Sequence, residues 1–404
     1  MRILVVADGL EPLLRSTVIG LAERGHEVRV VGATGPRELG PEDRFRLGRS
    51  VEVIGGEPGG SIRASVRGVR RVVRAATTDL STLRLVAERT RRAHGAGARF
   101  RAQMASYLPI LEWPADVVYF EAAYVAAEHA AVLDRLPPKV VMCTGSDVRI
   151  MPDENPWLRR ALPATFATMI RVVCRSEELV GWAVQRGAPP DRISVLPVAA
   201  DARTFTPAGR PPRPGDALRL VSVGRLHWVK GYEVAVEAVA RARARGADVT
   251  YTIVGEHRGS RAAVEFAIRD LGLDDVVTVA GQRSVDGVRA ALARSDVFVL
   301  PSLSEGTSRA AVEAMAMGLP VVTTDAGGMT ELVTDGVEGI VVARRDPDAL
   351  ADAFVVMAGN EARRRAMGEA AIRRAAEYDL PALLDATERL LIDAAATRVA
   401  GRAR

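Results

Sequence analysis

The chain has 404 residues, of which 48% are hydrophobic and 26% charged, and these values are typical of a globular protein of two or three domains. The net charge is +5, but aromatic residues make up only 4% and are not interleaved with basic ones, which argues against nucleic-acid binding. No apolar run reaches the roughly 20 residues of a membrane-spanning helix, and the first residues lack a signal-peptide pattern, so we expect a cytoplasmic protein.

The N-terminal half alternates short apolar runs with helical segments. It opens with an expected strand, helix and strand at Ile3–Ala7, Pro12–Arg24 and Glu27–Gly32. Further strands are expected at Val117–Phe120, Val140–Cys143, Ile170–Cys174 and Ile193–Leu196. Because most of these runs show little alternation, they indicate parallel strands that are covered on both faces. Cys143 and Cys174 lie inside two of the runs, and we interpret both as buried thiols.

A basic segment lies within this half. In SIRASVRGVRRVVR, residues 61–74, apolar side chains recur at helical spacing beside Arg63, Arg67, Arg70 and Arg74. The pattern predicts a basic amphipathic helix. Such a helix suits peripheral contact with an anionic membrane, but it is equally the pattern of a solvated face in an arginine-rich chain, and both interpretations stay open.

A proline-rich linker at residues 206–216, TPAGRPPRPGD, precedes a second and more regular alternation of strands and helices. Its strands are expected at Leu218–Val223, Val249–Val254, Val276–Ala280, Val297–Leu300, Pro320–Thr324 and Ile340–Val342. Repeated strands and helices with short loops predict an α/β fold of two Rossmann-like domains, whose parallel sheets face each other across an interdomain cleft. We expect these domains at residues 1–200 and 201–378, with a C-terminal helix at about 379–404 packing back on the first.

Ligands of such sheets bind beyond the carboxyl ends of the strands, so the loops there are the candidate sites. The loop GRLHWVKG, residues 224–231, follows the first strand of the second domain and precedes a helix. It carries Gly224, Arg225 and Lys230, and lysine occurs elsewhere in the chain only at Lys139. A guanidinium and an ammonium beside a helix N-terminus suit a diphosphate, and in this arginine-rich chain we infer that the lysine is kept for its compact charge.

A second candidate loop lies in PSLSEGTSRAAVEAMAMGLPVV, residues 301–322. Ser308 or Thr307 is a suitable N-cap for a helix at Arg309–Met317, which Gly318 would end. The amides of Gly306, Thr307 and Ser308 would then face an anion.

Two glutamates flank the start of this helix. In a continuous helix, Glu305 and Glu313 would be separated by about 12 Å. They therefore do not form a close carboxylate pair, and their separation suits the two ends of one extended ligand.

These motifs together resemble a known family. G-R-L-x-x-x-K-G at 224–231, the Glu-x7-Glu spacing of Glu305 and Glu313, and GGMTELVTDGVEG at 327–339 are similar to the donor half of the family 4 glycosyltransferases, which have GT-B architecture. The resemblance covers nearly all of residues 218–378. It implies a retaining, metal-independent transferase that uses a nucleoside-diphosphate sugar and no cofactor.

The resemblance also assigns roles in the donor domain. Arg225 and Lys230, after Gly224, would hold the diphosphate, Glu313 the ribose, and Glu305 the donor sugar. The nucleobase would lie near Gly255-Glu256 and Gly281-Gln282-Arg283, although His257 stands where relatives have glycine. We therefore expect Glu305, Arg225 and Lys230 to be catalytic. The expected donor-binding residues are Glu313, Gly224, Gly306, Thr307, Ser308, Arg283 and Gly255, and no DxD motif suggests a metal.

The N-terminal half, which would bind the acceptor, departs from the family pattern. The paired glycines after the first strand are replaced by Asp8-Gly9-Leu10-Glu11, and the usual His-x-His by Tyr119-Phe120-Glu121. Gly145-Ser146-Asp147 retains the family's GSD, but Thr144 precedes it in place of histidine. Gly9, Glu121 and Asp147 are the candidates on the acceptor side, and a structural role for Glu121 or Asp147 remains an equal alternative.

The expected function is transfer of a hexosyl group from a UDP- or GDP-sugar, such as GDP-mannose, to an acceptor in cell-envelope polysaccharide, glycolipid or small-molecule glycoside synthesis. One alternative is a sugar-nucleotide epimerase or hydrolase on the same frame. Another is a non-catalytic module that binds nucleotide sugars. A nicotinamide-dependent dehydrogenase is disfavoured because no G-x-G-x-x-G follows the first strand of either half.

Overall fold

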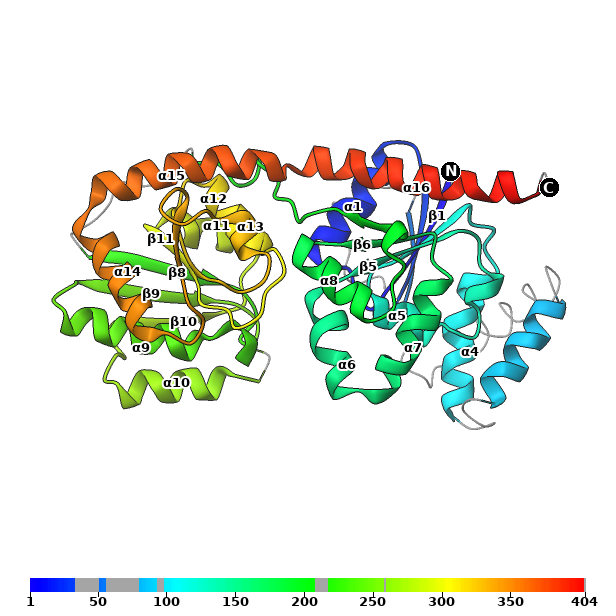
Figure 1. Cartoon of the computed structure of the whole chain (residues 1–404), viewed down its shortest axis with the longest axis horizontal. Helices are drawn as coiled ribbons and strands as arrows, with labels where there is room; N and C mark the ends of the chain where they lie inside the picture. The colour runs from blue at the N-terminus through cyan, green and yellow to red at the C-terminus, as the bar shows by residue number, and fades with distance from the viewer. Residues whose placement is uncertain (33–50, 56–79, 93–97, 208–216, 258, 403–404) are drawn as a thin grey trace. The chain divides into compact units, whose positions relative to one another are not determined.

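The computed structural model describes the chain except for residues 33–50, 56–79, 93–97, 208–216, 258 and 403–404. The described chain divides into two compact units. Figure 1 shows the chain coloured from its N-terminus to its C-terminus. The N-terminal unit contains Met1–Leu196 and Leu384–Arg404, and the C-terminal unit contains Pro197–Leu383. The predicted basic helix with Arg63, Arg67, Arg70 and Arg74 lies outside the described residues, as does most of the predicted linker.

The N-terminal unit is built on a seven-stranded parallel sheet. Its order is β3-β2-β1-β4-β5-β6-β7. The strands are β1 (Arg2–Ala7), β2 (Glu27–Gly32), β3 (Val51–Gly55), β4 (Val117–Phe120), β5 (Lys139–Cys143), β6 (Arg171–Cys174) and β7 (Ile193–Val195). The helices include α1 (Pro12–Glu23), α4 (Ala98–Leu111), α5 (Ala123–Glu128), α6 (Met151–Glu154), α7 (Pro156–Ala167), α8 (Glu177–Gln185) and α16 (Leu380–Arg402), the last belonging to this unit from Leu384 on.

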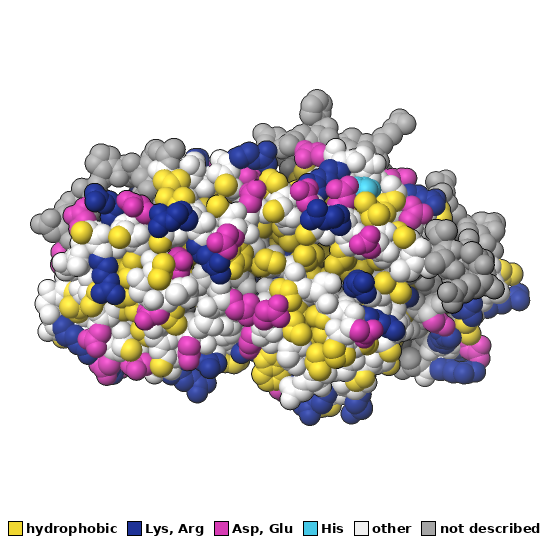
Figure 2. All heavy atoms as spheres, turned by 45° about the horizontal axis from the view of Figure 1, so that its top comes forward, with side chains coloured by type: hydrophobic (Ala, Val, Ile, Leu, Met, Phe, Trp, Pro, Cys, Tyr) yellow, Lys and Arg dark blue, Asp and Glu magenta, His cyan; other side chains and the backbone are white. Residues whose placement is uncertain are grey.

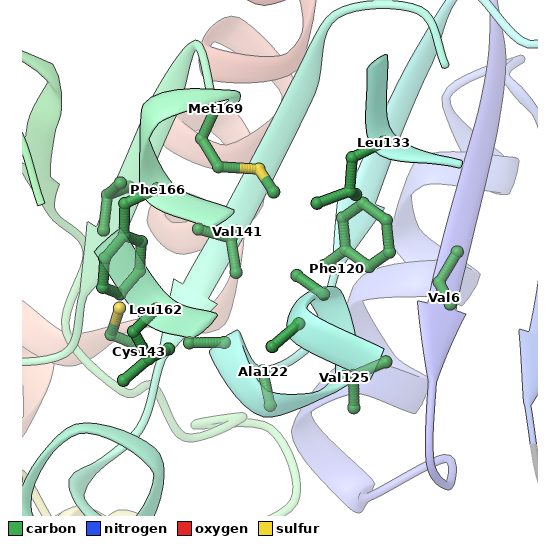
Figure 3. Close-up of a cluster of buried hydrophobic side chains, with 14 of the residues drawn as sticks. Val6, Phe120, Ala122, Val125, Leu133, Val141, Cys143, Leu162, Phe166 and Met169 are labelled. Carbon is green, nitrogen blue, oxygen red and sulfur yellow. The ribbon is translucent and has the colours of Figure 1, made fainter. Parts of the chain in front are cut away.

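Both faces of this sheet are covered, as the uninterrupted apolar strands predict. On one face, the buried cluster includes Cys143 beside Leu162 and Phe166 of α7, and Phe120 beside Leu133 (Figure 3). On the other face, residues of α1 and α16 cover the alternate side chains of β1, β4 and β5. Burying apolar surface in this way is the main stabilising contribution to such a layered fold.

The two cysteines lie on adjacent strands of this sheet. Cys143 of β5 is the register partner of Cys174 of β6, and both are buried and free. The prediction of buried thiols is confirmed.

The end of α1 and the C-terminal helix are joined by charged groups within the N-terminal unit. Glu388 of α16 lies 2.7 Å from His26 Nε2 and accepts a hydrogen bond from Arg24 at 3.2 Å. Because Arg24 and His26 follow α1 directly, these contacts hold the end of that helix to α16.

The C-terminal unit has a six-stranded parallel sheet of order β10-β9-β8-β11-β12-β13. The strands are β8 (Leu218–Val223), β9 (Val249–Val254), β10 (Val277–Gly281), β11 (Val297–Leu300), β12 (Val321–Thr324) and β13 (Gly339–Val342). The helices are α9 (Tyr232–Ala244), α10 (Arg261–Asp270), α11 (Val285–Ala293), α12 (Arg309–Ala316), α13 (Met329–Leu332), α14 (Pro347–Gly359) and α15 (Glu361–Ala375). In Figure 1, α9, α10 and α14 cover one face of this sheet, and α11 and α12 lie on the other.

Both sheets reverse their strand order at one point. In the N-terminal unit the reversal lies between β1 and β4, and in the C-terminal unit between β8 and β11. The loops that leave two such strands diverge to opposite faces, which opens a crevice where ligands of doubly wound sheets bind. The loops after β8 and β11 are the two that carry Lys230 and Glu305.

The predicted α/β class, two Rossmann-like domains with parallel sheets, is confirmed. The predicted strands agree with the observed ones to within about one residue at each end, the uncertainty inherent in assigning element ends. The structure adds β3, whose five residues Val51–Gly55 were not predicted as a strand, and a helix at residues 80–92.

One face of the molecule mixes both signs of charge (Figure 2). On the face shown in Figure 2, Lys and Arg side chains are interspersed with Asp and Glu. Among the residues described, no helix is sufficiently long and apolar to cross a membrane.

Candidate functional site

The loop after β8 carries the first group of predicted residues. A 3-10 turn at Trp228–Lys230 leads to Gly231, whose φ of 63° is left-handed, and α9 begins at the next residue. A side-chain carbon at Gly231 would lie 2.2 Å from the carbonyl oxygen of Pro301, so only glycine fits there. This close approach brings the end of the β8 loop, with Lys230, against the start of the loop after β11.

Lys230 and Glu305 form an ion pair between these two loops. Each side chain is only 15% exposed, and Ser302 Oγ donates a second hydrogen bond to Glu305 Oε2 at 3.0 Å. The backbone N–H of Leu303 donates to the carbonyl of Val229 at 2.7 Å. The ammonium and the carboxylate are therefore fixed relative to each other at the point where the strand order reverses.

Helix α12 begins as the sequence predicts. Ser308 is its N-cap and accepts from the backbone N–H of Ala311 at 3.3 Å, and both Thr307 and Ser308 are buried. The cap satisfies one amide of the first turn. Gly306 and Thr307 precede the cap in the same loop as Glu305. The predicted anion-binding amides therefore follow directly on the glutamate that pairs with Lys230.

Glu313 lies on the second turn of α12 and is only 5% exposed. Its Oε1 is 3.4 Å from Nε of Arg309, one helical turn earlier. Burial raises the pKa of the Glu313 carboxyl, and the nearby Arg309 guanidinium lowers it. A largely buried carboxyl of this kind is suited to accept hydrogen bonds from vicinal hydroxyls, because few waters compete for it.

A pocket of about 260 Å³ lies beyond the carboxyl ends of β9 and β10. It is lined by Leu226, Gly255, Glu256, His257, Arg261, Val279, Gly281 and Gln282. A side-chain carbon at Gly255 would lie 1.8 Å from the carbonyl oxygen of Gly224, so the backbones of the two loops are in contact at this point. The pocket and the diphosphate-binding candidates of the β8 loop are therefore contiguous.

Two predicted basic residues are more open. Arg225 and Arg283 are exposed, and Arg283 does not line the pocket although Gly281 and Gln282 do.

In the part of the chain that the structure describes, no cluster of three or more His, Cys, Asp or Glu side chains could hold a metal ion.

In the N-terminal unit, Asp147 is fully buried. Its carboxylate accepts from the backbone N–H groups of Ala123 at 2.6 Å and Thr144 at 2.7 Å. Burial raises the pKa of Asp147 to about 7, while these hydrogen bonds act in the opposite direction. Asp147 therefore ties the loop after β4 to the loop after β5, which favours the structural interpretation of this residue.

Glu121 lies directly after β4 and is partly buried. Burial, and then the neighbouring Glu11, raise the pKa of Glu121 to about 7. On the adjacent loop after β1, which carries Gly9, Asp8 accepts a hydrogen bond from Tyr124 Oη at 3.0 Å. Gly9 and Glu121 thus lie on the two loops that flank the reversal of strand order in this sheet.

Three residues of the predicted donor region were missed by sequence reasoning. Ser302 supports Glu305, Arg309 pairs with Glu313, and Tyr232 is buried at the start of α9. The spacing of four between Arg309 and Glu313 on a predicted helix was a usable signal. Nothing in the sequence distinguishes Ser302 or Tyr232 from ordinary residues of a loop and a core.

Comparison with protein families gives a match for the C-terminal unit. Residues 217–360 match the family described as "Glycosyl transferases group 1". This range contains the Lys230–Glu305 pair, Glu313 and the pocket.

Two curated proteins are similar to part of the chain. A D-inositol 3-phosphate glycosyltransferase of Pseudarthrobacter chlorophenolicus is 37% identical over 201 residues, which are 47% of this chain and 47% of that protein. The amylovoran biosynthesis glycosyltransferase AmsK of Erwinia amylovora is 33% identical over 189 residues, 44% of this chain and 45% of that protein. The chain thus spans about half the length of the curated relatives it matches.

The fold extends the similarity to the whole chain. A crystal structure of Anabaena HepE in complex with UDP and glucose superposes with a TM-score of 0.72 at 18% identity, covering 97% of this chain and 99% of that one. At this identity the likeness shows the fold, and it confirms the GT-B class predicted from the sequence.

Proposed function

We propose, on the premise that residues 217–360 form a domain of the group 1 glycosyltransferases, that this chain transfers a hexosyl group from a UDP- or GDP-sugar to an acceptor hydroxyl with retention of anomeric configuration. The observation that carries the proposal is the Lys230–Glu305 pair, which lies where the strand order reverses and beside a pocket with the volume to take part of a nucleotide.

The donor would extend across the C-terminal unit from the pocket to the ion pair. Its base would occupy the pocket beside Gly255 and Gly281, and Glu313 would accept hydrogen bonds from the ribose. The diphosphate would lie between Lys230, Arg225 and the start of α12, because helix N-termini and cationic side chains both attract anions. The contact between Gly255 and Gly224 supports this path, since it lets one ligand reach both loops.

Chemistry would take place at Lys230 and Glu305. As the bond between sugar and phosphate breaks, negative charge develops on the departing diphosphate, and a fixed cation stabilises that transition state more than the ground state. Glu305 would hold the ammonium in place and contact the donor sugar. Ser302 would keep the Glu305 carboxylate oriented.

The N-terminal unit would bind the acceptor. Glu121 has a pKa raised to about 7, so near neutral pH its carboxyl group can accept a hydrogen bond from an acceptor hydroxyl or donate one to it. Gly9 lies on the neighbouring loop. Asp147 would position the loop that carries Glu121. We propose an acceptor in cell-envelope polysaccharide, glycolipid or small-molecule glycoside synthesis, and action in the cytoplasm, including contact with an anionic membrane surface.

A thermal-shift panel of UDP, GDP and their sugars tests donor binding, because a ligand at 100 times its Kd adds about 2.7 kcal/mol of stability. An assay of nucleotide release with and without candidate acceptors then tests transfer. Release that depends on an acceptor supports the proposal. Release without an acceptor would identify a hydrolase, epimerisation without release would identify an epimerase, and binding with neither would identify a binding module.

A further inference from the structure

The hydroxyl of Tyr232 has no hydrogen-bond partner among the described residues, although the side chain is completely buried. Buried hydroxyl groups are normally hydrogen-bonded, since burial without a partner costs free energy. Tyr232 is the first residue of α9, a helix of 13 residues, and it follows Lys230 by two positions. The unsatisfied hydroxyl therefore belongs to the proposed donor site rather than to a remote part of the core.

The geometry around Gly224 shows where this hydroxyl lies. A side-chain carbon at Gly224 would come within 2.8 Å of Tyr232 Oη, 3.5 Å of Lys230 Cε and 3.9 Å of Lys230 Nζ. The hydroxyl and the lysine side chain thus both lie close to the position that a Cβ of residue 224 would take. Any side chain at position 224 would fill the space that they share.

We infer that the Tyr232 hydroxyl is a further ligand-binding group of this site, which donates a hydrogen bond to an anionic oxygen of a nucleoside diphosphate lying over Gly224. The inference rests on the proposed function. Lys230 has a flexible stem, so its methylene groups can move aside and open the way to the hydroxyl while the ammonium stays paired with Glu305. The N-terminus of α9, with its partial positive charge, favours an anion at the same place.

The protonation state of Tyr232 agrees with a donor role. Burial raises the pKa of its hydroxyl well above the ordinary value, and the nearby carboxylates of Glu305 and Glu233 act in the same direction. The group therefore keeps its proton at physiological pH. Hydrogen bonds to ionised acceptors are also stronger than those to neutral ones, so a phosphate oxygen is a better partner than water.

Tyr251 provides a matched control. It is also buried in this unit, but its hydroxyl is 2.7 Å from Ser222 Oγ and is satisfied in the free protein. Removing the two hydroxyls should therefore have opposite consequences. Tyr251→Phe should lower the melting temperature of the free protein and leave nucleotide affinity unchanged, whereas Tyr232→Phe should not lower the melting temperature but should weaken diphosphate binding.

The experiment measures melting temperatures of the wild type, Tyr232→Phe and Tyr251→Phe, and their Kd values for UDP, GDP, uridine and guanosine by calorimetry. We expect Tyr232→Phe to raise the Kd of the diphosphate that the wild type binds by about tenfold or more, the effect of losing a hydrogen bond to a charged group. The Kd of the matching nucleoside, which has no phosphate, should stay the same.

Three results would overturn the inference. One is a wild-type Kd for the diphosphate in Tyr232→Phe, and another is an equal loss of nucleoside affinity, which would indicate altered packing. A fall in melting temperature equal to that of Tyr251→Phe would show that the hydroxyl has a partner in the free protein. Failure of the wild type to bind either diphosphate would overturn the proposed function together with this inference.

Discussion

Lys230 and Glu305 are separated by 75 positions in the sequence, yet they form one ion pair between the loops that leave β8 and β11. Neither side chain is more than 15% exposed, so the pair is shielded from much of the solvent screening that weakens surface ion pairs. Mutagenesis can separate the effect of removing the ammonium from the effect of removing the carboxylate.

Replacing the ammonium tests the role proposed for it with the departing diphosphate. Lys230→Ala should lower kcat by about 100-fold or more, on the scale of losing one preorganised electrostatic donor. Initial rates at saturating donor give the measurement, and the melting temperature shows whether the fold is kept. Turnover at the wild-type rate would refute the role of Lys230.

Replacing the carboxylate should divide binding from turnover. In Glu305→Gln the amide oxygen can still accept from Ser302 Oγ, but Lys230 loses its ionised partner and is free to bind the diphosphate. We expect the Kd of the bound nucleoside diphosphate to stay equal or to fall, while kcat falls by at least about tenfold, because the ammonium is no longer held and the contact to the sugar changes. A rise in the Kd of the nucleoside diphosphate with an unchanged kcat would contradict this arrangement.

The contact between Gly255 and Gly224 predicts a steric effect. In Gly255→Ala the new methyl would lie 1.8 Å from the Gly224 carbonyl oxygen, so the backbone must move, and we expect a loss of about 1–3 kcal/mol in the free energy of unfolding together with weaker nucleotide binding. Urea unfolding and calorimetry measure the two effects. Gly359→Ala is the control, because nothing lies within 4 Å of its added carbon, and it should be neutral or slightly stabilising.

Glu121 predicts a pH dependence of stability. Its pKa rises from 4.5 to about 7 on folding, so between these values the folded state binds more protons than the unfolded state. The contribution of Glu121 to the free energy of unfolding is therefore fully present below about pH 4.5 and is lost as pH rises towards 7. At about 1.4 kcal/mol per pKa unit the loss is limited to about 3 kcal/mol.

Glu121→Gln carries no titratable group at this position and should lack this loss. The measurement is the difference in unfolding free energy between wild type and variant from pH 4.5 to 8, in which the parallel contribution of Asp147 cancels. The wild type should lose stability relative to Glu121→Gln as pH rises through this range. A difference that is constant with pH would show that Glu121 titrates as it does in the unfolded chain.

The sequence predicted the fold well because local signals agreed with one another. Uninterrupted apolar runs marked the buried parallel strands, and Ser308 marked the start of α12 by its capping chemistry. Strand β3 was missed because five residues, with Glu52 inside and Gly55 at the end, give too short a pattern. Such a strand owes its conformation to its pairing with β2, which is a non-local interaction.

The site was predicted only in part for the same reason. The sequence placed Lys230 and Glu305 in two loops, but their pairing depends on β8 and β11 being neighbours, and periodicity does not give strand order. The near-complete burial of Glu313 likewise depends on how α12 packs in the folded unit, which is a non-local property. The unsatisfied hydroxyl of Tyr232 emerges only when every neighbour in space is known.

The fit of Gly231 against Pro301 has a practical consequence for redesign. At this point the backbones of the loops 224–231 and 301–308 are in contact. A longer or bulkier version of either loop would therefore need a compensating change in the other. Attempts to change which nucleobase the proposed donor site accepts should therefore leave residues 224–231 and 301–308 intact. Randomised libraries are better directed at Glu256, His257 and Gln282, which line the pocket and take no part in the contact between Gly231 and Pro301.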